Sequence, residues 1–197
     1  MHTHPEEEMT YVMVKPDGVK RGLIGEIVHR FERVGLKVIA MEMVKPTKEM
    51  IDEHYPKDPK WITRLGEKTL TTYAKYGYDA NKDFGTDKAE ELGPMVREWL
   101  ISYMISGPVV KMILQGVHAV DMVRKMAGHT LPYMADVGTI RGDYSVDSPA
   151  VANREKRGVH NLMHASETPE EAKHEIEFWF KKDQIHAYKR GEEDLMI

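Results

Sequence analysis

The spacing of apolar residues predicts four short strands. Residues 11–14 form an unbroken apolar run, and residues 36–44 form a longer run rich in Val, Ile and Met. Two more runs follow at residues 109–114 and 159–164. Apolar runs of this length that end in turn residues are typical of strands.

Helical periodicity lies between these runs. From Ile24 to Phe31 the apolar residues recur at i, i+3, i+4 and i+7, and Gly35 follows where a helix would end. We expect a loop at residues 77–86. A long irregular segment is expected at residues 129–158, and such length is typical of a functional loop. Further helices are expected at residues 48–55, 60–75, 87–105 and 117–126, and after Thr168.

This order of elements predicts an α+β fold. It is that of a ferredoxin-like split βαβ core, in which a four-stranded antiparallel sheet carries helices on one face. A mainly helical insertion occupies about residues 57–95. No repeat or linker divides the chain, so we expect a single domain over residues 1–197, with the polar segment 183–197 running over its surface.

The composition argues against several kinds of binding partner and of chemistry. The chain is 41% hydrophobic and 30% charged, which is typical of a globular protein. A formal net charge of −4 gives no general attraction to nucleic acid or to an anionic membrane. The absence of cysteine excludes disulfides, thiolate catalysis and cysteine zinc sites. The chain starts without an apolar run and has no stretch long enough to span a bilayer, so we expect a cytoplasmic protein.

A strong helix start follows the fourth apolar run. Thr168, Pro169 and Glu171 match the Ncap, N1 and N3 positions of a capping box. The helix that follows carries an apolar stripe from Ala172 to Phe180. This helix should therefore pack one face against the core.

Glu175 lies inside that apolar stripe, where a carboxylate is costly unless it is paired. The imidazole of His164 is the nearest attractive partner. A carboxylate that holds one ring nitrogen leaves the other free to attack an electrophile, so we interpret His164 as a nucleophile oriented by Glu175. The alternative is a satisfied core histidine beside an N-cap.

Cationic and hydroxyl side chains recur where the predicted elements end. The glycines at 138 and 142 are expected to let the backbone approach a ligand. Each charge alone could be a solvated surface group, but together they predict an anion site in an acidic chain. An anion site beside a nucleophilic histidine implies phosphoryl transfer through a phosphohistidine. The side chains concerned are Lys15, Tyr55, Arg124, Thr130, Arg141 and Asn161.

Four motifs resemble the nucleoside diphosphate kinase family. They are Val14-Lys15-Pro16-Asp17-Gly18-Val19 with Arg21-Gly22, Ser106-Gly107-Pro108-Val109-Val110, Gly138-Thr139-Ile140-Arg141-Gly142-Asp143 and Asn161-Leu162-Met163-His164-Ala165-Ser166. The resemblance covers residues 11–55, 96–143 and 160–180.

The resemblance implies a ping-pong reaction in which a nucleoside triphosphate gives its γ-phosphoryl group to His164 and a nucleoside diphosphate takes it back. It implies Mg²⁺ carried by the nucleotide phosphates, no metal ligands from the protein, and a homohexamer or homotetramer. Because sugar and phosphate contacts read no base identity, broad base specificity is expected. The resemblance implies that Lys15 and Asn161 contact the sugar hydroxyls, and that Lys15, Arg124, Thr130 and Arg141 contact the phosphates. Tyr55 and Lys15 are expected to line the place of the transferred group. Glu175 is expected to hold His164, with a hydrogen bond from Ser166 to Glu175.

The chain departs from the family pattern at several positions. Ala165 replaces the usual glycine after the histidine, and Glu167 replaces an aspartate while keeping its charge. Val96 stands where an aromatic residue typically stacks on the nucleobase, and is expected to contact the base more weakly. Val137 replaces a proline in the loop that contacts other subunits.

The largest departure is insertion. About thirty extra residues precede Val96 and about ten follow Asp143, beyond ordinary connection lengths. Acidic residues from Asp79 to Glu90 have a spacing similar to that of a calcium-binding EF-hand loop. The glycine that makes the sharp turn in such loops comes one residue late here, at Gly85. We therefore prefer to interpret this segment as a solvated acidic loop. We expect the insertion to pack on the nucleotide site or on a neighbouring subunit through Trp61, Tyr73, Tyr76 and Tyr78.

Two other interpretations remain. A ferredoxin-like module could bind single-stranded nucleic acid, but the negative charge and the lack of aromatic residues in runs 109–114 and 159–164 argue against nucleic acid as a partner. An inactive scaffold of the same family is disfavoured because His164 and its cations are retained.

Overall fold

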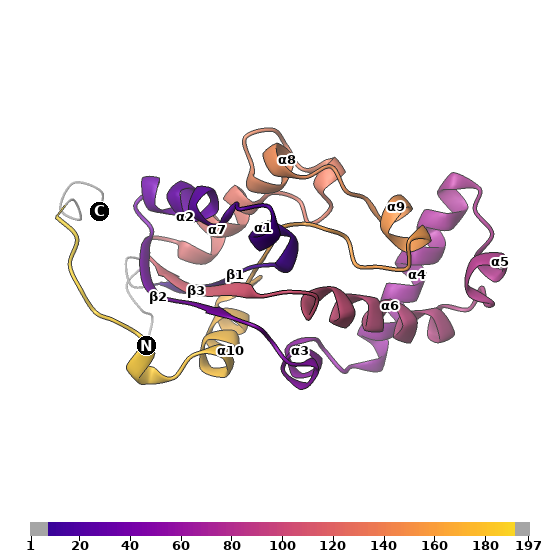
Figure 1. Ribbon diagram of the computed structural model, residues 1–197, viewed down its shortest axis with the longest axis horizontal. Coiled ribbons are helices and arrows are strands. Elements are labelled where there is room, and N and C mark those ends of the chain that lie inside the picture. The colour runs from indigo at the N-terminus through magenta and orange to yellow at the C-terminus, as the bar shows by residue number, and fades with distance from the viewer. Residues whose placement is uncertain (1–7, 192–197) are drawn as a thin grey trace.

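The computed structural model describes residues 8–191, in which strands and helices alternate (Figure 1). The strands are β1 Met9–Val14, β2 Lys37–Val44, β3 Val109–Gln115 and β4 Met163–Ala165. The α-helices are α1 Pro16–Lys20, α2 Ile24–Arg33, α3 Lys48–His54, α4 Pro59–Tyr76, α5 Ala80–Phe84, α6 Ala89–Met104, α7 Ala119–Ala127, α8 Ile140–Tyr144, α9 Pro149–Arg154 and α10 Pro169–Trp179. Two 3₁₀ turns, η2 Pro132–Met134 and η3 Lys182–Gln184, complete the set.

The predicted antiparallel sheet is confirmed, and within residues 8–191 its strands lie in the order β2-β3-β1-β4. The fourth strand is shorter than predicted: it covers residues 163–165, not 159–164. Leu162 has a φ of +70°, in the left-handed region, which interrupts an extended ladder just before β4. The segment 159–162 is therefore a loop beside the site.

Helices cover both faces of the sheet, whereas we expected helices on one face. Alternate residues of β1 enter two separate cores: Val12 and Val14 pack with α2 and α7, while Tyr11 and Met13 pack with α3, α10 and the end of α6. The sequence of β1 explains this arrangement, because a strand without alternating polar residues must be covered on both faces.

The insertion forms helix α4, which packs antiparallel to α6, and the close approach of the two helices depends on glycine. A Cβ at Gly66 would lie 2.1 Å from the carbonyl oxygen of Ala89, and a Cβ at Gly93 would lie 2.2 Å from that of Ile62. The paired helices extend away from the sheet, with α9 beside α4 (Figure 1).

The acidic loop expected at residues 77–86 contains a short helix, α5, and this is a correction. Asp79 is its N-cap and accepts from the amide of Lys82 at 3.0 Å, while Asp83 accepts from the hydroxyl of Tyr73 at 3.0 Å. Gly85 ends the helix with a φ of +79°. Capping and packing thus account for the spacing that imitates a calcium loop.

The segment 129–158 is also more regular than expected, since it holds η2, α8 and α9. These pieces are too short to show a helical period in the sequence. After α10, the chain returns along β2, where the amide of His186 donates to the carbonyl of Ile39 at 2.9 Å. The surface course expected of the tail is confirmed for residues 185–191, and residues 192–197 lie outside the described part. No helix within residues 8–191 is long and apolar enough to cross a bilayer.

Candidate active site

His164 is held by the pairing of β4 with β1, where it lies opposite Met13. Three residues separate the end of β4 from the start of α10. The hydroxyl of Thr168 accepts from the amide of Glu171 at 3.1 Å, which confirms the predicted N-cap. The reciprocal bond differs from a capping box, because the Glu171 carboxylate accepts from the amide of Glu167 and not from that of Thr168. The cap fixes the start of α10 beside His164.

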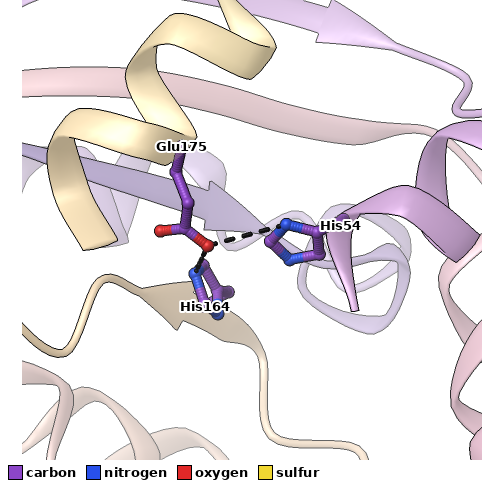
Figure 2. Close-up of side chains that lie close together, drawn as sticks. All are labelled: His54, His164 and Glu175. Carbon is purple, nitrogen blue, oxygen red and sulfur yellow. Dashed lines mark ion pairs between the residues drawn. The ribbon is translucent and has the colours of Figure 1, made fainter. Parts of the chain in front are cut away.

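The predicted pairing of His164 with Glu175 is present (Figure 2). Nε2 of His164 lies 2.7 Å from Oε1 of Glu175, although the ring N–H is not aligned for an ideal hydrogen bond, so the attraction is mainly electrostatic. Ser166, which is fully buried, donates its hydroxyl to Oε2 of Glu175 at 2.6 Å. Since Nε2 faces the carboxylate, Nδ1 is the ring nitrogen left for chemistry.

Glu175 is ionised although it is only 5% exposed. Burial alone would raise the pKa of its carboxyl, but the attraction of His164 and the hydrogen bond from Ser166 outweigh burial and lower that pKa. A buried negative charge behind the imidazole keeps a proton on Nε2. It also stabilises any positive charge that develops on the ring.

A second histidine, His54, completes this group, and the sequence analysis did not predict it. Its Nδ1 lies 3.6 Å from Oε1 of Glu175 (Figure 2). The same nitrogen accepts from the indole N–H of Trp179 at 3.4 Å. Burial, followed by the repulsion of His164, lowers the pKa of His54 to about 3, so its ring is neutral. The only signal in the sequence is its position before Tyr55 at the end of α3.

Lys15 lies at the end of β1 and points to the loop before β4. Its ammonium donates to Oδ1 of Asn161 at 2.8 Å, and its backbone amide donates to the carbonyl of Leu162 at 2.8 Å. Burial and the nearby charge of Arg141 lower the pKa of Lys15 to about 8, against the opposing effect of Asp17. Lys15 therefore loses its positive charge at a lower pH than an ordinary lysine.

The side chain of Arg141 is held in place by hydrogen bonds to the protein backbone. Its guanidinium donates to the carbonyls of Gly128 at 2.7 Å, Asn161 at 3.1 Å and Met163 at 2.9 Å. Burial and the repulsion of Arg124 lower its pKa to about 10, so it remains charged near neutral pH. It therefore fixes the backbone on both sides of Leu162 and leaves two of its five N–H donors for another partner.

The glycines of this motif do not serve the role we expected. A Cβ at Gly142 would lie 2.1 Å from the carbonyl oxygen of Asp136, so this glycine permits close packing of the chain on itself. Gly138 has a φ of +93°, which L side chains rarely adopt. Both glycines thus shape the turn before α8 and the packing of α8, which carries Arg141.

Asp17 and Tyr103 are two further residues that the sequence did not assign. Oδ1 of Asp17 accepts from the hydroxyl of Tyr103 at 2.5 Å, and its Oδ2 accepts from the amide of Leu162 at 3.1 Å. Asp17 is part of a recognised motif, but only the fold shows that it holds the strained Leu162. The carboxylate of Asp17 thus helps to hold the loop 159–162, to which the backbone of Lys15 also bonds.

Most of the predicted site residues meet around one cavity of about 330 Å³, the first cavity. Ser166 lies behind Glu175 and outside the lining. Val96 lines a neighbouring cavity of about 580 Å³, the second cavity, which meets the first at Thr130. Trp61 of the insertion also lines the first cavity and stacks on Tyr55 with ring centres 6.2 Å apart. The predicted residues in the first cavity are Lys15, Tyr55, Arg124, Thr130, Arg141, Asn161, His164 and Glu175.

A carboxylate-backed imidazole that faces a cavity lined by one lysine and two arginines defines an enzyme that transfers phosphoryl groups. A sequence model of the nucleoside diphosphate kinase family matches residues 8–61 and 88–185. The chain belongs to the nucleoside diphosphate kinase family, which confirms the resemblance, the fold and the exchange of a phosphoryl group between nucleoside triphosphates and diphosphates.

The chain is similar over most of its length to archaeal and bacterial members. It is 48% identical to the nucleoside diphosphate kinase of Pyrobaculum aerophilum over 90% of this chain and 97% of that protein. The crystal structure of an NDP kinase from the same organism has a TM-score of 0.87 at 46% identity, covering 91% of this chain and 98% of that chain. A transition state mimic of the Borrelia burgdorferi enzyme, with bound vanadate and ADP, has a TM-score of 0.74 at 36% identity, covering 94% of each chain.

Proposed function

We propose that Nδ1 of His164 carries the phosphoryl group between the two nucleotides. The 2.7 Å approach of Nε2 to the ionised Glu175 supports this assignment, because it keeps the proton on Nε2 and a lone pair on Nδ1. Nδ1 attacks the γ-phosphorus, the bond to the β–γ bridging oxygen breaks, and the electron pair leaves with the nucleoside diphosphate. A second diphosphate reverses the step with its own terminal oxygen.

The remaining side chains position the phosphates and neutralise charge. Lys15 is half-buried and bonds to Asn161, so it is aimed at the cavity before any ligand arrives. Arg124 and Arg141 line the same cavity. We assign phosphate contacts to Lys15, Arg124, Thr130 and Arg141, contacts with the sugar hydroxyls to Lys15 and Asn161, and lining of the transferred group to Tyr55. Preorganised charge of this kind lowers the barrier without reorganisation during the reaction.

Family members use a divalent cation with their nucleotides, and we propose Mg²⁺ here. The carboxylate oxygens of Glu175 are engaged by His164 and Ser166, and Glu171 accepts from the amide of Glu167. Of the carboxylates that line the cavity, exposed Glu167 is therefore the one suited to reach a hydrated ion. Mg²⁺ keeps several of its waters and bridges phosphates, so it needs no protein cage. When bound, it would neutralise charge on the transferred group.

Nucleoside di- and triphosphates are the proposed partners, in a homohexamer or homotetramer of single-domain subunits. The apolar side chain of Val137 is 92% exposed in the loop expected to contact other subunits. Light scattering of the purified protein measures the assembly, and a monomer would contradict it. The cytoplasmic location and the extent of the single domain, 1–197, stay predictions.

Incubation with γ-labelled ATP and then with GDP tests the assignment. We expect acid-labile label on His164, chased to GTP by GDP. His164→Ala should abolish both steps and keep the fold, while the exposed His29→Ala should change neither. Label on another residue, or turnover by His164→Ala, would overturn the proposal.

A further inference from the structure

Tyr55, which we assign to the transferred group, lies in the turn between α3 and α4. It is the C-cap residue of α3, with an extended backbone (φ −84°, ψ 140°), and Pro56 follows it. Helix α4 begins at Pro59. The last carbonyls of a helix have no partner inside that helix, so another group must hold this end of α3 and, with it, Tyr55.

The backbone carbonyl of Asp52 is one of these groups. In a continuing helix it would accept from the amide four residues later, but that residue is Pro56, which has no N–H. Arg97 of α6 supplies the missing donor, because its Nη2 donates to the carbonyl of Asp52 at 2.8 Å. Helix α6 thus completes the end of α3, against which it packs.

Arg97 holds the same turn at three more points. Its Nη1 donates to Oδ1 of Asp52 at 2.6 Å, its Nη2 donates to the carbonyl of Tyr55 at 3.3 Å, and its Nε donates to the carbonyl of Pro56 at 3.3 Å. The side chain of Arg97 is only 12% exposed and lines neither the first nor the second cavity. The planar guanidinium therefore fixes the backbone that carries Tyr55 without facing the ligand itself.

The ring of Tyr55 is held as well. Trp61, in the first turn of α4, stacks on it with an angle of 23° between the ring planes. The amide of Trp61 donates to the carboxylate of Asp58 at 3.0 Å, which caps α4 and fixes its start. Burial raises the pKa of the Tyr55 hydroxyl, so the hydroxyl keeps its proton and can donate to a phosphate oxygen.

We propose that Arg97 is a positioning residue, which holds the hydroxyl of Tyr55 at the place of the transferred phosphoryl group. This rests on the proposed function, which assigns Tyr55 to that group. Because Arg97 acts only through Tyr55, it should matter for ligands that carry a γ-phosphate. ADP ends at its β-phosphate and does not fill the place of the transferred group, so its affinity should not depend on Arg97.

Calorimetric binding of ADP and of β,γ-imido-ATP, whose γ-phosphate is not transferred, tests this without requiring turnover. Arg97→Met should bind β,γ-imido-ATP about tenfold more weakly than wild-type protein, as expected for the loss of one hydrogen bond to a charged group. Its affinity for ADP should stay unchanged. Lys57→Met is the matched control, because Lys57 pairs with the carboxylates of Asp52 and Glu53. It should bind both ligands as wild-type protein does.

A double-mutant cycle with Tyr55→Phe separates positioning from a merely structural role. Tyr55→Phe should lose the same factor for β,γ-imido-ATP, and Arg97→Met should add no further loss in that background. Additive losses, or equal weakening of ADP and β,γ-imido-ATP by Arg97→Met, would overturn the positioning role.

Arg97→Lys is a milder variant that keeps the charge but not the planar set of donors, and it serves the same cycle if Arg97→Met does not fold. It should weaken binding of β,γ-imido-ATP alone, and unchanged binding would contradict the proposal. Unchanged binding of β,γ-imido-ATP by Tyr55→Phe would contradict the assigned role of Tyr55 and this inference together. Absence of label on His164 with an intact cycle would contradict only the phosphohistidine.

Discussion

The hydroxyl of Ser166 lies 2.6 Å from Oε2 of Glu175, on the carboxylate whose other oxygen faces His164. Ser166 is fully buried and makes no contact with the first cavity. We therefore propose that Ser166 is a positioning residue, which acts through Glu175 by fixing the direction of the carboxylate beside the imidazole.

Ser166→Ala should lower kcat about tenfold, because a hydrogen bond to a charged group is worth about 1.5–3 kcal/mol and its loss lets Glu175 rotate. The KM for nucleotides should change little, since Ser166 does not line the cavity. Steady-state kinetics measures both values. Ser102→Ala, on the exposed side of α6, should match wild-type protein. A lower unfolding temperature with unchanged kcat would show that Ser166 is merely structural.

Nucleotide affinity should fall in mildly alkaline solution. The pKa of Lys15 is lowered to about 8, so its positive charge is lost as the pH rises through that value, and phosphate attraction is lost with it. The KM for a nucleoside diphosphate should rise above about pH 8 and stay level below it. Lys20→Met, at an exposed lysine of α1, should keep this limb, whereas Lys15→Met should have a high KM at every pH.

Acid should destabilise the fold through His54. Burial lowers the pKa of the folded-state imidazole to about 3, against an ordinary value of about 6.5, so the unfolded chain binds a proton that the folded chain does not. The stability contribution is intact above about pH 6.5 and is lost as the pH falls toward 3, at about 1.4 kcal/mol per pH unit.

Urea unfolding of wild-type protein and of His54→Asn between pH 7 and pH 4.5 measures this difference. Asparagine can still accept from the Trp179 indole but does not titrate, so the variant should lose less stability on acidification. His29→Asn, at an exposed histidine, should follow the wild-type curve. Parallel curves for wild-type protein and His54→Asn would contradict the buried neutral state.

Helices α4 and α6 pack so closely that a side chain at position 93 should destabilise the protein. The added Cβ of Gly93→Ala would lie 2.2 Å from the carbonyl of Ile62 and force the helices apart. We expect a loss of about 1–3 kcal/mol in the free energy of unfolding, typical of overpacking. Gly25→Ala in α2, where a Cβ meets nothing within 4 Å, should instead be about 0.5–1 kcal/mol more stable. Equal effects of the two substitutions would argue against the close contact.

The sequence was informative wherever a local rule applied. The apolar runs placed three of the four strands closely, and the inward position of Glu175 on an amphipathic helix predicted its pairing with His164. The fourth strand was overextended because nothing in the residue order reveals that Leu162 is left-handed. That conformation depends on Asp17 and Lys15, which lie far away along the chain.

The position of His54 beside Glu175 and the three carbonyl contacts of Arg141 were decided only by tertiary structure. Each depends on groups separated by many residues, and a spacing rule cannot report which of them share one cavity. By itself, the sequence predicted three of the four strands, the longer helices, and the histidine and cations proposed to act in the site, because periodicity, capping and side-chain chemistry are local. Folding decided which charges are buried, which backbone groups they hold, and that α4 and α9 line one cavity, because those properties arise from long-range contacts.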